Sequence, residues 1–116
     1  MVDFPRGQRP LSQVDVERMI ASDIQLLEEA TTDYSEALIE EAHAEAAYKK
    51  SWSRVFLSVS GARHVKEAAA DDQCCDENER RLLACARSKA LREHMWTIRA
   101  RLDSLRSLNA NVREQV

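Results

Sequence analysis

Apolar side chains recur every three or four positions through residues 79–116, and this spacing limits what the chain can fold into more than any other feature. In the heptad notation abcdefg, the d row holds Ala84, Leu91, Ile98, Leu105 and Val112, and the a row holds Ser88, Met95, Leu102 and Asn109. The pattern predicts one continuous seam along a helix of about ten turns. This seam must be buried against another helix, because apolar side chains are more stable away from water.

A second long helix is predicted from Ser12, its N-cap, to about residue 59. Its expected seam holds Ile20, Ile24, Leu27, Thr31, Tyr34, Leu38, Tyr48, Trp52, Val55 and Val59. Glu41 and Glu45 interrupt this seam, and the arginines of residues 79–116 are the expected partners of these carboxylates. The neighbouring alanines favour instead a slightly rotated helix, or a close approach by another helix.

Serines and Gly61 are expected to end this helix. A short helix is predicted over residues 62–70, and a turn within residues 71–76 is predicted to leave Asp76 as the N-cap of the last helix. Long helices joined by a short connection lie antiparallel. The predicted fold is therefore all-α: an antiparallel, coiled-coil-like hairpin of two long helices with a short connecting helix, self-associating into a helical bundle.

The composition agrees with long helices, since two Gly, two Pro and 5% aromatic residues stand against 32% charged residues. Residues 11–50 hold ten acidic and three basic side chains, whereas residues 80–116 hold nine basic and three acidic ones. The simplest consequence is that the two long helices pair with each other. Residues 1–10 are predicted to be a flexible arm rich in Pro, Gly and Arg, ahead of a single helical domain over residues 11–116.

Several large apolar residues lie off both seams, and two helices alone cannot bury them. They are Met19, Leu26, Ile39, Phe56, Leu57, Leu82, Leu83, Trp96 and Leu108. Burying each such side chain stabilises by about 1.5–3 kcal/mol, so we expect copies of the hairpin to associate. The expected interface holds Trp52, Phe56, Leu82, Leu83, Trp96, Leu108 and Asn109. Asn109 either fixes the register of that assembly, as buried a-position amides do, or lies in a fraying terminus without a role.

Four arginines, Arg92, Arg99, Arg106 and Arg113, follow the d residues of the last helix at strict seven-residue spacing. We call them the arginine row. In the expected register the facing e residues are Ala21, Glu28, Ser35, Ala42, Lys49 and Phe56, of which only Glu28 is an obvious ionic partner. The row is therefore expected either to follow the phosphates of a nucleic acid or to form salt bridges within the bundle and between copies. Aromatic residues among these arginines are limited to Trp96, so no stacking platform for bases is expected.

No arrangement typical of catalysis is visible, so the chain is predicted not to be an enzyme and to use no cofactor or metal. Glu40 and His43 have the Glu-x-x-His spacing of di-iron bundles, but residues 79–116 offer no matching motif. The three cysteines have no CxxC spacing and are expected to be ordinary thiols. Neither a signal peptide nor a membrane span is recognisable, which predicts a cytoplasmic protein without membrane contact.

The segments 41–52 and 91–113 resemble small helical proteins encoded by tailed bacteriophages. The long helices, the Tyr-Lys-Lys sequence at residues 48–50 and the lack of an enzymatic motif are similar to phage recombination mediators of the UvsY type. That resemblance implies a helical oligomer that helps to load a recombinase onto single-stranded DNA. It also implies that Lys49, Lys50 and Arg54 face the DNA together with the arginine row.

The function expected from these features is that of a non-catalytic, oligomeric phage accessory protein. It would assist DNA recombination or replication by contacting nucleic acid, single-stranded DNA in particular, and a partner enzyme. The alternative is an adaptor or inhibitor that lays its helices on a host or phage enzyme and has no contact with DNA.

Overall fold

The computed structural model of the chain describes residues 11–114, so the predicted flexible arm at residues 1–10 lies outside the described part. Three helices make up this part, with no strand among the described residues: α1 (Gln13–Ser58), α2 (Arg63–Gln73) and α3 (Cys75–Glu114). Contacts gather the chain into two units. Of the described residues, the terminal unit joins 11–30 to 95–114, and the turn unit spans residues 31–94.

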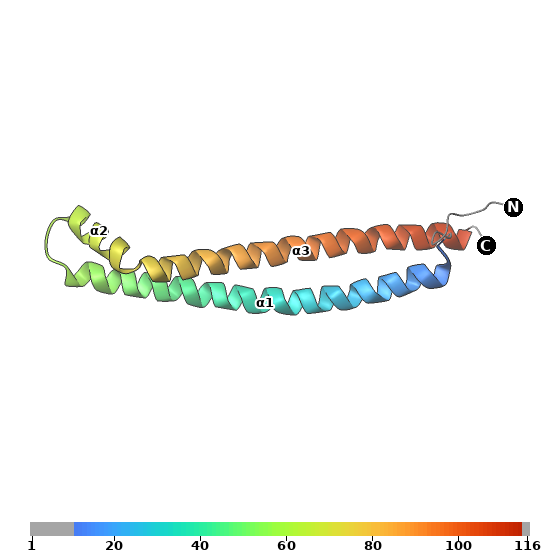
Figure 1. Ribbon diagram of the computed structural model, residues 1–116, viewed down its shortest axis with the longest axis horizontal. Helices are drawn as coiled ribbons and strands as arrows, with labels where there is room; N and C mark the ends of the chain where they lie inside the picture. The colour runs from blue at the N-terminus through green and yellow to red at the C-terminus, as the bar shows by residue number, and fades with distance from the viewer. Residues whose placement is uncertain (1–10, 115–116) are drawn as a thin grey trace, which may run out of the picture. The chain divides into compact units, whose positions relative to one another are not determined.

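In the terminal unit, the start of α1 runs antiparallel to the end of α3 (Figure 1). Two ionic contacts between the helices show this direction: Glu17 pairs with Arg113, and Asp23 pairs with Arg101. Val16 and Ile98 are fully buried in the core of this unit, together with Leu102 and Leu105 at seam positions of α3.

In the turn unit, the rest of α1 runs antiparallel to the start of α3, and α2 lies against the end of α1 (Figure 1). Glu40 pairs with Arg87 across the two long helices. The indole N–H of Trp52 on α1 donates a hydrogen bond of 2.9 Å to Asp71 of α2. The antiparallel hairpin with a short connecting helix is confirmed.

The predicted seam of α3 is confirmed along its whole length. Six of its residues are buried, namely Ala84, Ser88, Met95, Ile98, Leu102 and Leu105, and the other three, Leu91, Asn109 and Val112, are half-buried. A heptad pattern that runs unbroken for five repeats leaves one direction in which a helix can bury its apolar side chains.

The predicted seam of α1 is correct in one row, whereas the other row is wrong at Ile24, Thr31 and Leu38 and half-buried at Trp52 and Val59. The row Ile20, Leu27, Tyr34, Glu41, Tyr48 and Val55 is half-buried as expected, but Ile24, Thr31 and Leu38 are exposed. The second core row is instead Val16, Asp23, Ala30, Ala37 and Ala44. Small side chains in this row let the backbone of α1 lie close to the large side chains of α3, and the helix is rotated accordingly. A rotated helix is one of the two explanations that the sequence offers for the alanines near Glu41. The rotated core row includes residues of both units.

The ends of the helices follow the predicted capping chemistry in part. Ser12 caps α1 as expected, because the backbone N–H of Asp15 donates to the Ser12 hydroxyl at 3.2 Å while the Asp15 carboxylate accepts from the backbone N–H of Ser12 at 3.3 Å. The turn before α3 falls at Cys74, within the predicted range. Asp76 is not the N-cap, because α3 begins at Cys75 and places Asp76 inside its first turn, where the helix dipole favours an acid.

The expected arginine partners of Glu41 and Glu45 were wrong. Glu41 accepts a hydrogen bond of 2.6 Å from the Ser88 hydroxyl, and Glu45 pairs with Lys49 on its own helix. Glu41 and Ser88 both lie at a positions, where the two helices face each other. The short serine side chain leaves space for the longer glutamate and donates a hydrogen bond to it. Arg87, one residue before Ser88, reaches Glu40 instead.

Candidate nucleic-acid interface

The rotation of α1 changes which residues face the arginine row. The second core row of α1 holds Asp23, Ala30 and Ala37, each one residue before the expected Ile24, Thr31 and Leu38. The expected e positions that began with Ala21 are therefore wrong. The e positions of α1 are Glu17, Ile24, Thr31, Leu38, Glu45 and Trp52. Glu17 reaches Arg113 at 3.8 Å, and Arg106 has a contact of the same length with Asp103 on its own helix. Both contacts are long and solvent-exposed, and such pairs contribute about 0–1 kcal/mol.

The row nevertheless stays exposed on the surface. All four arginines are exposed, Arg92 in the turn unit and Arg99, Arg106 and Arg113 in the terminal unit. Two of the residues at the facing e positions, Ile24 and Leu38, are uncharged and exposed. The contact of this exposed row with a nucleic acid stays a prediction.

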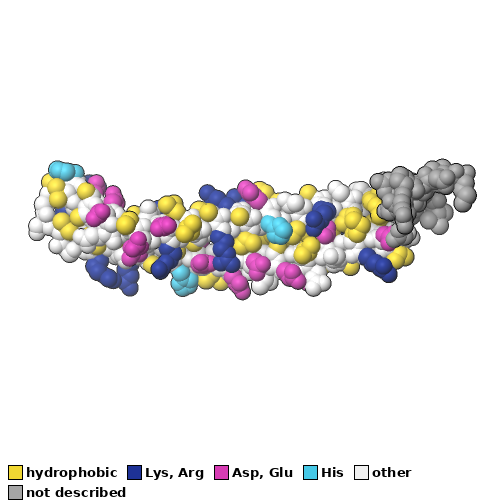
Figure 2. Space-filling view, in the orientation of Figure 1, with side chains coloured by type: hydrophobic (Ala, Val, Ile, Leu, Met, Phe, Trp, Pro, Cys, Tyr) yellow, Lys and Arg dark blue, Asp and Glu magenta, His cyan; other side chains and the backbone are white. Residues whose placement is uncertain are grey.

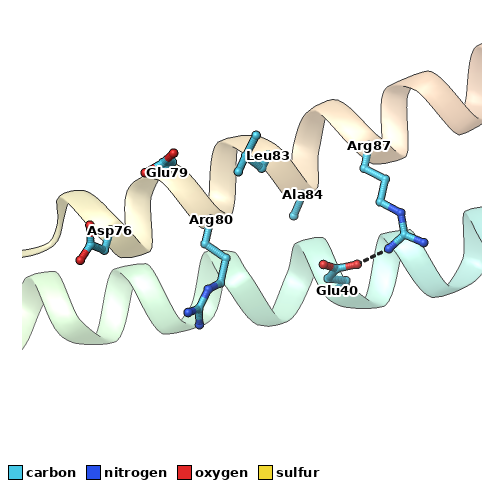
Figure 3. Close-up of a pocket in the computed structure, with 7 residues that line it drawn as sticks. All are labelled: Glu40, Asp76, Glu79, Arg80, Leu83, Ala84 and Arg87. Carbon is cyan, nitrogen blue, oxygen red and sulfur yellow. Dashed lines mark hydrogen bonds and ion pairs between the residues drawn. The ribbon is translucent and has the colours of Figure 1, made fainter.

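The opposite side of the long helices carries a balanced groove in the turn unit. It is lined by Glu40, Asp76, Glu79, Arg80, Leu83, Ala84 and Arg87. Figure 3 shows Arg80 and Arg87 reaching from α3 toward α1, whereas Glu79 and Leu83 lie on the side away from it. Three acids stand beside two arginines, one of which is bound to Glu40, so this groove offers no net attraction for a phosphate.

Three aromatic residues form a cluster that the sequence interpretation missed. Tyr48, Trp52 and Phe56 follow one another at a spacing of four on α1, and we call them the aromatic ladder. The rings of Trp52 and Phe56 are stacked, with centres 5.2 Å apart and planes 14° from parallel. The Arg81 guanidinium lies 4.9 Å from the centre of the Tyr48 ring, and the Lys66 ammonium 4.7 Å from that of Phe56. The turn unit thus holds stacked aromatic rings beside cations, away from the single Trp96 that the sequence interpretation considered.

The same region has an unbroken basic stretch. Residues 49–66 contain five Lys and Arg side chains and His64, and no Asp or Glu. Lys49, Lys50 and Arg54, predicted from the resemblance to face DNA, are exposed there, as is Arg63. This acid-free stretch and the four-residue spacing of the rings were both visible in the sequence. They were missed because the seam pattern accounts for Tyr48 and Trp52 by burial alone, whereas both rings are only half-buried.

Of the seven residues expected to form an interface between copies, three are exposed in the single chain and four are half-buried. Leu83 is 63% exposed and Trp96 55%, and Leu82 is exposed as well, whereas Trp52, Phe56, Leu108 and Asn109 are half-buried. Figure 2 shows hydrophobic side chains at the surface among the charged ones. The side-chain oxygen of Asn109 is buried, with no hydrogen-bond donor among the described residues. An amide in that state costs free energy, which favours neither of its two predicted roles over the other.

The cysteines and histidines do not assemble into a site. Cys74 is buried, Cys75 is exposed, Cys85 is half-buried, and each is a free thiol. Burial raises the pKa of the Cys74 thiol, and the charges of Glu77 and Asp71 raise it further. No group of three or more His, Cys, Asp or Glu within residues 11–114 could hold a metal ion. The three helices of this range also include none that is long and apolar enough to cross a bilayer.

Compared with protein families, curated proteins and solved structures, the chain gives no match.

Proposed function

We propose that this chain is a non-catalytic helical accessory protein that associates with copies of itself and contacts nucleic acid. The observation that carries the proposal is that several large apolar side chains are exposed while much smaller ones fill the core row of α1. The core row of α1 holds alanines, whereas Ile39 is 60% exposed, Leu57 79% and Leu83 63%. A chain that leaves several large apolar side chains exposed gains free energy when a second helical surface covers them.

Self-association is tested by light scattering of the full chain during size-exclusion chromatography. Ile39→Glu/Leu83→Glu adds two charges to the exposed apolar surface of the turn unit and is expected to reduce the measured mass toward that of one chain. The matched control is Thr32→Glu/Ala90→Glu, which adds the same charges at exposed positions one heptad before Ile39 and one heptad after Leu83. A parent protein of single-chain mass at micromolar concentration contradicts this part of the proposal.

Contact with nucleic acid is supported by two basic surfaces, the arginine row and the acid-free stretch of residues 49–66. Cations that approach phosphates release condensed counterions, so binding should weaken steeply as salt rises. The test is the fluorescence anisotropy of labelled DNA, and Arg92→Glu/Arg99→Glu is expected to weaken binding. If the parent shows no binding at about 50 mM salt, where phosphate contacts are strongest, this part is wrong.

The setting proposed for such a protein is phage DNA recombination or replication in the host cytoplasm, beside a partner enzyme. This setting depends on the resemblance of segments 41–52 and 91–113 to phage helical proteins.

An adaptor or inhibitor without DNA contact is the second candidate. It is favoured by the ion pairs that already hold basic residues of α3, namely Arg87 with Glu40 and Arg101 with Asp23. Association without any affinity for DNA would support this candidate over the first.

A further inference from the structure

We infer that the aromatic ladder and the cations around it form a stacking site for single-stranded nucleic acid in the turn unit. This inference rests on the proposed contact with nucleic acid and names its place and its preferred ligand. Two hollows meet at Trp52. One is an open groove of about 570 Å³ lined by Trp52, Phe56, Gly61, Arg63, Lys66 and Glu67, and the other is lined by Tyr48, Lys49, Trp52 and Ser53.

The ladder supplies aromatic surface that is held in place. Trp52 is fixed from one side by the stacked ring of Phe56 and from its N–H by Asp71 of α2. Trp52 is only half-buried, although it makes both contacts. A rigid, partly exposed indole between two hollows is suited to stacking with a nucleobase, because every base presents a π-face.

Cations line both hollows beside the rings. Lys49 lines the hollow beside Tyr48, and Arg63 and Lys66 line the groove beside Phe56. The bases of a duplex are stacked on one another and cannot reach the indole, whereas those of a single strand can. The arrangement therefore favours a single strand over a duplex.

The two acids that pair with Lys49 and Arg63 do not block an incoming phosphate. Glu45 pairs with Lys49 at 3.2 Å and Glu67 with Arg63 at 2.9 Å, each four residues apart on one helix. Both cations are largely exposed, at 73% and 86% of their side chains. Exposed pairs of this kind contribute only about 0.3–0.5 kcal/mol, so a phosphate can compete for the cations.

The test uses the full-length chain with labelled oligo(dT), oligo(rU) and a duplex of equal length. Trp52→Leu removes the indole and is expected to weaken oligo(dT) binding by about ten-fold, the loss typical of one base–aromatic contact. Asp71→Ala removes only the hydrogen-bond acceptor of Trp52 and should keep most of the affinity. In a Trp96→Phe background, the fluorescence of Trp52 should be quenched when oligo(dT) binds. The two single strands compared with each other show whether the sugar matters.

The cations are tested through the dependence of affinity on salt. Lys49→Gln/Arg63→Gln should lower the slope of log K against log salt by about 1.4, since each phosphate contact on a single strand adds about 0.7. Lys89→Gln is the control, because Lys89 is an exposed cation of the turn unit that lines neither hollow.

The outcomes separate the two proposals. If the parent binds no nucleic acid, the proposed contact falls and this inference falls with it. If the parent binds, but Trp52→Leu binds equally well and Arg92→Glu/Arg99→Glu does not, only the stacking site is wrong. Equal affinity for the duplex and the single strand overturns the stacking site, and so does binding of the full-length chain to phosphatidylserine vesicles without binding to oligo(dT).

Discussion

The carboxylate of Asp23 lies in the core row of α1 and accepts two hydrogen bonds from the guanidinium of Arg101, at 2.6 Å from Nε and 2.8 Å from Nη2. The Asp23 side chain is only 9% exposed, whereas that of Arg101 is 50% exposed. Hydrogen bonding to Asp23 raises the pKa of Arg101, and the charge of Asp23 raises it further, so the guanidinium stays charged. A buried anion is thus held by a cation that also reaches solvent.

This asymmetry predicts unequal effects of removing the two partners. Arg101→Met leaves a buried carboxylate without its hydrogen-bond donors and is expected to lower the urea midpoint of unfolding more than Asp23→Leu, which leaves a cation that water can hydrate. The double variant should be more stable than Arg101→Met alone, because the unpaired anion is gone. Equal losses from the two single variants would show that Asp23 is solvated.

The alanines of the core row predict a strong response to size. Ala37 is 1% exposed, and Ala37→Leu should destabilise the fold by about 1–3 kcal/mol because α1 and α3 must move apart to admit the larger side chain. Ala86→Leu, at an exposed position of α3, should change stability little. Thermal and urea unfolding followed by circular dichroism measures both. A neutral Ala37→Leu would mean that the helices are not closely packed there.

The hydrogen bond from Trp52 to Asp71 predicts how firmly α2 is held. Trp52→Phe keeps an aromatic ring but removes the donor, so the amides of α2 should exchange with solvent faster while those of α3 exchange as before. Trp96→Phe is the control, since Trp96 lies outside the turn unit. Hydrogen exchange with mass spectrometry reads both segments, and unchanged protection of α2 would assign its docking to other contacts.

The two adjacent cysteines are predicted to differ in reactivity. Burial raises the pKa of Cys74 and keeps reagents from its sulfur, whereas Cys75 is exposed, so iodoacetamide should label Cys75 first. A thiol whose pKa is higher in the folded state than in the unfolded one keeps the fold fully stable below its ordinary value of 9.0 and destabilises it as the pH rises through the raised value.

Cys74→Ala should therefore remove part of the alkaline loss of stability that the parent shows above that value. Cys75→Ala is the matched control, and it should leave the alkaline loss in place. Peptide mapping after brief alkylation checks the order of labelling, and faster labelling of Cys74 would contradict its burial.

Much of the fold was predictable because its signals are local. Spacing and capping chemistry within one segment predict the seam of α3, the Ser12 cap and the turn near Cys74. The antiparallel hairpin follows from the short connection between the two long helices. The seam of α1 was less certain because Ile24, Leu38 and Trp52 offer an apolar row beside the true one. Hydrophobicity alone favours that row, and only close packing against α3 favours the alanines.

The candidate site, too, has features that the sequence predicts and contacts that only the structure shows. The exposed arginine row and the basic residues at 49–66 could be identified from charge alone. The pairing of Glu40 with Arg87 and the joining of Trp52 to Asp71 bring together residues that lie 47 and 19 positions apart, and no spacing rule predicts those contacts.

The sequence by itself determined that the chain forms two long amphipathic helices of opposite charge, since hydrophobic periodicity and composition act within each helix. The tertiary structure decided how far α1 is rotated, and hence which large apolar side chains face water. The physical reason is that the rotation minimises the energy of both helices together: small residues of α1 permit a close approach that neither helix can specify alone.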